Sequence, residues 1–139
     1  MTDNQTSGRA SRRKAAGTAV ERAVCKKYNL APDHSGRADA AYPSTGTPVE
    51  IKGALRRKSD GRGGTKEGEF FVFEEPHKWL RRRDGYYVFA VYRFRGTGVQ
   101  ILKTKRVHAS KLPYFSFHES GHTKRDNDRE ARFKVSQIF

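Results

Sequence analysis

The feature that most constrains the fold is residues 86–94, whose sequence is YYVFAVYRF. This run is apolar almost throughout, whereas a strand with one face in water alternates between apolar and polar side chains. It therefore predicts a central strand covered on both faces, as in an α/β sandwich. Residues 99–103, VQILK, are predicted to pair beside it through a turn at 96–98. With 139 residues, the chain is long enough for one domain with a modest core.

Residues 12–28 have the apolar spacing of an amphipathic helix. The apolar positions that define this helix are Ala16, Ala19, Val20, Ala23 and Val24. Downstream, residues 38–42 and 48–52 are predicted to be strands, because the PSTG sequence between them is typical of a turn. Residues 1–11 are small and polar, and we expect them to be a flexible, basic and polar arm that precedes a single domain over residues 12–139.

Residues 53–69 are glycine-rich and basic, which predicts a mobile loop. A short strand is predicted at 70–73, and a helix at 76–83, where a proline suits the first helical turn. The pattern beyond Leu112 predicts, in order, a strand, a polar loop and a segment that docks on the core, at 114–118, 119–132 and 133–139.

The chain carries 29 Lys and Arg residues against 15 Asp and Glu residues, which gives a formal charge of +14. This excess favours a polyanionic partner, with nucleic acid the first candidate and an anionic membrane surface the second. No apolar run reaches the length of a membrane span or of a secretory signal. Cys25 is the only cysteine, which excludes an internal disulfide and a cysteine-rich zinc site and is consistent with a reducing cytoplasm.

The basic residues are concentrated in four runs, at 9–14, 56–66, 78–83 and 93–106. One interpretation is a solvated surface. The interpretation we favour, because the four runs occur together, is a surface that follows a DNA backbone, with binding that weakens steeply as the salt concentration rises. The candidate DNA contacts in these runs are Arg12, Arg13, Arg56, Arg57, Lys58, Lys78 and Arg81.

Residues 48–53, PVEIKG, contain the most informative charged pair of the chain. Alternation along a strand sends Val49 and Ile51 to one face and places Glu50 and Lys52 together on the other. This pair is either an ion pair on the wet face of an edge strand or part of a charged site completed by residues from elsewhere.

Two acidic residues upstream offer partners for this pair. Asp39 lies inside a predicted strand, where an aspartate is a poor choice, and Glu21 lies at the border of the apolar face of the first helix. Binding of a divalent cation such as Mg²⁺, which prefers oxygen ligands, would explain three carboxylates near one lysine. The lysine can then orient or help deprotonate a water and offset negative charge on a phosphate.

The order of a helical glutamate, SGRAD at 35–39 and VEIK at 49–52 resembles the PD-(D/E)xK nuclease superfamily. Within it, the sequence is most similar to the archaeal-type Holliday junction resolvases and their restriction-endonuclease-like relatives. The resemblance covers residues 17–53 and, more loosely, the chain to about residue 94, and Ala38 stands where the name-giving proline would be. It implies an α/β fold with a three-layer restriction-endonuclease-like core, in which helices flank a mixed central β-sheet.

The resemblance also implies roles for individual residues. Asp39 and Glu50 would hold a Mg²⁺ ion, for which Mn²⁺ can substitute, and Glu21 would complete the site. Lys52 would assist the attacking water. Ser35 matches a serine that is functionally important in the resolvases.

The function expected from these features is that of a Mg²⁺-dependent endodeoxyribonuclease, most specifically a structure-selective Holliday junction resolvase. Such an enzyme would act on branched or junction DNA as a homodimer. The alternatives are a restriction- or repair-type endonuclease of the same fold and a non-catalytic DNA-binding protein, and the presence of both acids and the lysine favours an enzyme. We expect a cytoplasmic protein, prokaryotic or viral and nucleoid-associated, with no membrane partner.

Overall fold

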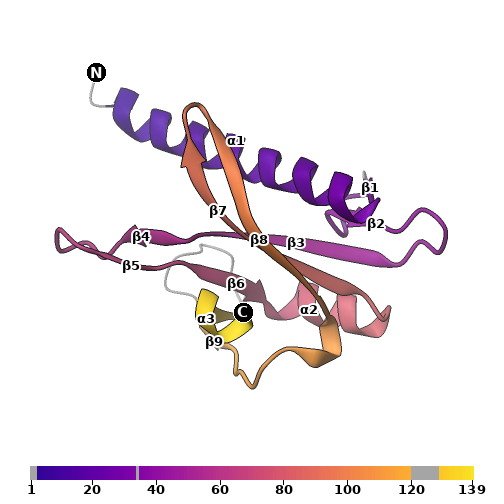
Figure 1. Cartoon of the computed structure of the whole chain (residues 1–139). Helices are drawn as coiled ribbons and strands as arrows, with labels where there is room; N and C mark the ends of the chain where they lie inside the picture. Colours follow the sequence, from indigo (N-terminus) through magenta and orange to yellow (C-terminus); the bar gives the residue numbers. More distant parts are fainter. Residues whose placement is uncertain (1–2, 34, 120–128) are drawn as a thin grey trace.

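The computed structural model of the chain describes residues 3–33, 35–119 and 129–139 (Figure 1). The elements in chain order are α1 (Asp3–Tyr28), β1 (Ala31–Pro32), β2 (Ala40–Ala41), β3 (Pro48–Leu55), β4 (Arg57–Ser59), β5 (Thr65–Glu67), β6 (Glu69–Phe73), α2 (Glu74–Arg82), β7 (Tyr86–Arg95), β8 (Gly98–His108), the 3-10 helix η1 (Ala109–Lys111), β9 (His118–Glu119), β10 (Arg129–Lys134) and α3 (Val135–Ile138). None of the helices in these ranges is long and apolar enough to cross a membrane.

The central sheet has five strands in the order β1-β2-β3-β7-β8. β3 and β7 run parallel, with Val49 opposite Tyr86, and the other neighbours are antiparallel. The sheet is therefore mixed, and β7 lies between β3 and β8. Residues 87–91 of β7 are all buried, because neighbouring layers cover both faces of this strand. The structure thus confirms the central strand that the apolar run predicts.

Two layers cover this sheet, one on each side (Figure 1). α1 packs on one face, where Val24 belongs to a cluster with Val49 and Val88. The other face is covered by α2, α3 and a second sheet of order β6-β10-β9. There Phe70 of β6 packs against Phe89 of β7, with ring centroids 4.8 Å apart. The α/β fold with a mixed sheet between helices is confirmed.

Residues 53–69 are not the loop that their glycines suggest. β3 continues into this segment, and β4 and β5 then pair as an antiparallel hairpin. Gly61 and Gly63 adopt positive φ angles of 78° and 84° in the turn, a conformation that favours glycine. The Asp60 carboxylate accepts a hydrogen bond from the Gly64 N–H at 3.0 Å, which closes the turn. The prediction of a loop was wrong because these glycines build a specific turn.

The N-terminal boundary also differs from the expectation of an arm over residues 1–11. α1 begins at Asp3, so residues 3–11 are helical and continuous with the amphipathic segment that packs on the sheet. No proline occurs between residues 3 and 28, so no residue that lacks a backbone N–H interrupts the helix near residue 12. α2 likewise starts at Glu74, two residues before the predicted position at Pro76.

The C-terminal predictions were correct in part. Only His118 of the expected strand at 114–118 belongs to a strand, because Phe115 and Phe117 instead pack their rings against His77. Residues 129–132 of the expected loop belong to β10, which pairs with β6, and residues 120–128 lie outside the described part of the chain. The docking segment is confirmed by a set of buried residues, namely Phe133, Val135 and Ile138.

A buried hydrogen bond joins α2 to the central strand. His77 Nδ1 lies 2.8 Å from the Tyr87 hydroxyl, and both side chains are buried. Burial, followed by the charge of Arg81, lowers the pKa of His77, so the ring is neutral at physiological pH. Without this bond, the His77 ring nitrogen and the Tyr87 hydroxyl would each lose a hydrogen-bond partner inside an apolar layer.

Replacing Tyr87 with phenylalanine is expected to lower the free energy of unfolding by about 1–3 kcal/mol, because His77 would keep its burial and lose its partner. Urea denaturation of wild type and Tyr87→Phe measures this change. Tyr114→Phe is the matched control, since the Tyr114 side chain is 96% exposed. Equal stability of all three proteins would contradict the prediction.

Candidate active site

The edge of β3 is where the sequence-predicted acidic residues meet. β2 is only two residues long and pairs with β3 through Ala40 opposite Val49. Extending this register by one residue puts Asp39 opposite Glu50, and side chains at opposed positions lie on the same face of a sheet. At this point the Asp39 side chain, in place of a strand backbone, is the hydrogen-bond partner of β3, because its Oδ2 accepts a hydrogen bond from the Ile51 N–H at 2.8 Å.

Glu50 and Lys52 lie together on the face of β3 that points away from α1. Lys52 Nζ is 3.8 Å from Glu50 Oε2, and these side chains are 22% and 14% exposed. The same amine lies 5.9 Å from the centre of the Phe73 ring on β6. Val49 on the opposite face packs in the cluster under α1. The alternation expected from the sequence is therefore present.

Electrostatics indicate that these carboxylates repel one another. Burial, and then the nearby charge of Asp39, raise the pKa of Glu50 to about 7, against a usual value of 4.5. Lys52 and a hydrogen bond from the Asp39 backbone oppose this shift without cancelling it. At neutral pH the Glu50 carboxyl is thus partly protonated, and positive charge brought to this site would stabilise its ionised form.

Glu21 approaches the same edge from the other side of β3. Glu21 is exposed on α1 and lines a pocket of about 220 Å³. Ile51 and Gly53, which face α1, line the same pocket. Partial burial, followed by the charge of Asp39, raises the pKa of the Glu21 carboxyl. Asp39 therefore interacts with Glu50 on one side of the edge and with Glu21 on the other.

The donor set suits a divalent cation held by two protein carboxylates. Across the described ranges, no group of three or more His, Cys, Asp or Glu side chains is placed to hold a metal ion, so a three-carboxylate site is not preformed. Mg²⁺ usually takes one or two carboxylates, with water and phosphate oxygens as the remaining ligands. Asp39 and Glu50 fit this requirement, because they are neighbouring carboxylates and the charge of Asp39 helps to raise the pKa of Glu50.

Arg12, Arg13 and Lys58 line a groove of about 580 Å³ that adjoins the Glu21 pocket. The Arg12 guanidinium stacks over the Phe94 ring at 4.0 Å. Lys58 Nζ forms an ion pair with Glu69 at 2.9 Å. These predicted DNA contacts therefore lie next to the pocket of Glu21.

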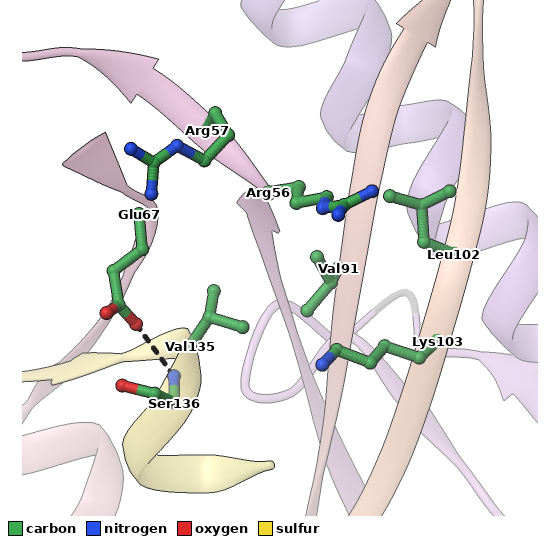
Figure 2. Close-up of a pocket in the computed structure, with 8 residues that line it drawn as sticks. All are labelled: Arg56, Arg57, Glu67, Val91, Leu102, Lys103, Val135 and Ser136. Carbon is green, nitrogen blue, oxygen red and sulfur yellow. Dashed lines mark hydrogen bonds between the residues drawn. The ribbon is translucent and has the colours of Figure 1, made fainter. Parts of the chain in front are cut away.

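Arg56 and Arg57 lie elsewhere, around a pocket of about 470 Å³ next to α3 (Figure 2). Figure 2 shows their side chains bordering the pocket together with that of Lys103. The Glu67 carboxylate in the same pocket accepts a hydrogen bond from the Ser136 N–H at 2.8 Å, and this bond lowers the pKa of Glu67. The two arginines thus belong to a cationic surface distinct from the groove of Arg12, Arg13 and Lys58.

The remaining predicted contacts are on α2 and in the turn before β2. Lys78 lies 3.8 Å from the Glu74 carboxylate, and Arg81 is exposed near the end of the helix. Ser35 is exposed and donates its backbone N–H to the Asp33 carboxylate at 2.9 Å, and its hydroxyl accepts a hydrogen bond from the Arg37 N–H. These residues are accessible to a large ligand, but they are not part of the charged edge.

Sequence reasoning missed three side chains near the site. Tyr87 is the strand neighbour of Glu50 on β7, and burial, followed by the Glu50 charge, raises its pKa. Phe71 and Phe73 project from the same side of β6, and the Lys58 and Lys52 amines lie over their rings. The alternation in FFVF is the signal that could have placed both rings on one face, opposite the buried Phe70.

A family model described as the PD-(D/E)XK nuclease superfamily domain matches residues 7–139. No curated protein and no solved structure matches the chain. The match is to the superfamily domain and does not single out the Holliday junction resolvases. Because it covers almost the full length, the chain belongs to the PD-(D/E)XK nuclease superfamily.

Proposed function

We propose that this protein is a divalent-metal-dependent endodeoxyribonuclease with its active centre at the edge of β3. Membership of the superfamily supports a nuclease and implies a DNA substrate. The observation that carries the proposal is the juxtaposition of Asp39, Glu50 and Lys52 on one face of an accessible strand edge. A solvated ion pair on a wet strand face would not explain why Glu50 is only 14% exposed, or why its pKa is raised beside a second carboxylate, that of Asp39.

In this proposal, Asp39 and Glu50 hold the cation, and Glu21 adds negative charge from the α1 side. The bound cation supplies positive charge that stabilises the phosphate as it takes on negative charge in the transition state. Lys52 lies beside Glu50, where its ammonium group can bind a phosphate oxygen or orient the attacking water. Water attacks phosphorus in line, and the 3′-oxygen leaves.

The raised pKa of Glu50 gives a testable pH dependence. A proton competes with a cation for this carboxylate near and below its pKa of about 7. At a fixed, subsaturating Mg²⁺ concentration, the cleavage rate should fall as the pH is lowered from about 8 to about 6, and excess Mg²⁺ should restore part of it. A rate that stays constant across this range, measured on supercoiled plasmid, would contradict the prediction.

The same shift has a consequence for the stability of the metal-free protein. Because the pKa of Glu50 in the folded protein lies above its usual value of 4.5, the folded state binds the proton more tightly than the unfolded state. The protonated Glu50 carboxyl therefore contributes its full stabilisation below about pH 4.5. This stabilisation is lost as the pH rises through about 7. In EDTA, melting temperatures of wild type and Glu50→Gln measure the effect, since the variant lacks this titration.

The test of the proposed function is incubation of the protein with supercoiled plasmid, with linear duplex and with a four-way junction, each in Mg²⁺ and in EDTA. Cleavage in Mg²⁺ that EDTA suppresses supports the nuclease. Binding without metal-dependent cleavage favours the non-catalytic alternative.

We further propose a structure-selective junction resolvase that acts as a homodimer. Symmetric paired nicks on the junction, with little cutting of linear duplex, support that subtype over a restriction- or repair-type enzyme.

A further inference from the structure

A second groove continues from the proposed active centre along β3. The pocket that contains Glu21 and the larger groove of about 580 Å³ share Arg13, Gly53 and Tyr92 as lining residues, so they adjoin. On the other face of β3, Lys52 lies 5.9 Å from the centre of the Phe73 ring on β6. Phe71, two residues from Phe73 and on the same face of β6, lines the groove. A polymer that places one phosphate at Lys52 can therefore reach the groove along β6.

The groove combines aromatic rings with cations. Phe71, Tyr92 and Phe94 line it, and all of them are partly exposed. Arg12 stacks on Phe94 at 4.0 Å, and Lys58 lies 5.7 Å from the centre of the Phe71 ring. Phe71 and Phe94 thus each have a positive charge beside the ring.

The groove keeps a net positive charge although one acidic residue lines it. Glu69 is the carboxylate among the lining residues, and it is paired with Lys58 at 2.9 Å and with Lys66 at 3.9 Å. The hydrogen bond from Lys58 lowers the pKa of Glu69, so the pair remains ionised. Arg12 and Arg13 add two further positive charges, and the groove therefore suits a polyanion.

The aromatic lining distinguishes between two forms of DNA. In a duplex the base faces are stacked on one another, so a protein surface meets phosphates and base edges. In a strand without pairing, the base faces are free to stack on aromatic side chains while cations follow the backbone. We propose that the groove of Arg12, Lys58, Phe71 and Phe94 binds unpaired nucleotides of the substrate next to the cleavage site, an inference that rests on the proposed nuclease function.

The experiment measures binding in EDTA, so that it is independent of cleavage. The probes are a labelled blunt duplex, the same duplex with an oligothymidine extension, and the same duplex with an abasic extension of equal length. The two extensions carry equal charge and differ only in their bases. We expect the oligothymidine extension to raise the affinity by roughly 5- to 100-fold over the blunt duplex, and the abasic extension to give a much smaller gain.

Variants then assign the preference to the groove. Phe71→Leu keeps apolar volume and removes the aromatic face, and it should reduce the gain from the oligothymidine extension. Phe71→Ala provides a second, more complete removal. Tyr114→Ala is the control, because Tyr114 is an exposed aromatic residue that does not line the groove, and it should leave the gain unchanged.

Two outcomes would overturn the inference: equal affinity for the thymidine and abasic extensions, or an unchanged gain in Phe71→Leu. Neither outcome bears on whether the protein cuts DNA. Conversely, a protein that shows the extension preference in EDTA but never cleaves plasmid or junction in Mg²⁺ would refute the proposed nuclease function. The two failures are therefore distinguishable.

Discussion

Replacing Asp39 with asparagine is expected to abolish metal-dependent cleavage while DNA binding stays close to that of wild type. Asparagine has nearly the same shape, and its side-chain oxygen can still accept the hydrogen bond from Ile51 that organises the strand edge. What it removes is one of the two adjacent carboxylate charges that we propose to hold the cation. The expected loss in cleavage rate is about 10²–10⁴-fold or more, the range found when a single catalytic charge or proton-transfer group is removed.

Lys52→Met should produce a loss of similar size, because it keeps the aliphatic stem and removes the ammonium group beside Glu50. Plasmid nicking in Mg²⁺ measures the rate, and fluorescence anisotropy in EDTA measures the binding. Glu75→Gln is the matched control, since this carboxylate is 70% exposed on α2 and pairs with Lys78. Near-normal cleavage by Asp39→Asn or by Lys52→Met would rule out the proposed centre, whatever other nuclease activity the protein has.

The second large effect concerns stability. Phe70→Ala is expected to lower the free energy of unfolding by about 3–5 kcal/mol, a large part of the roughly 5–15 kcal/mol typical of a small domain. Phe70 is fully buried between the two sheets, with its ring 4.8 Å from that of Phe89 and 6.4 Å from that of Phe139. Truncation would leave a cavity where β6, β7 and the C-terminal residue meet.

The adjacent Phe71 supplies the control, because alternation along β6 turns its ring outward to the groove, where it is partly exposed. Phe71→Ala should therefore cost much less stability than Phe70→Ala in urea denaturation. Equal losses in the two variants would mean that Phe70 does not have the buried position described above. This comparison also establishes that Phe71→Ala is folded enough for the DNA-binding experiment.

Local sequence patterns predicted the structure correctly where a single pattern of apolar residues dominates a segment. The apolar run at 86–94 predicted the central strand, and the alternation in PVEIKG put Glu50 and Lys52 on one face. Such patterns failed where polar or glycine-rich residues form regular structure. The hairpin of β4 and β5 depends on a turn closed by Asp60, and β10 depends on pairing with β6, which lies far away in the sequence.

The sequence by itself determined which side chains could carry the chemistry, because the order of Glu21, Asp39, Glu50 and Lys52 is a property of the chain. Only the tertiary structure decided which of them meet. The register of β2 against β3 sets Asp39 opposite Glu50, and burial in the three-layer fold raises the pKa of Glu50. The physical reason is that both depend on contacts between distant segments. A carboxylate in an unfolded chain is surrounded by water and has neither a fixed neighbour nor a desolvation cost.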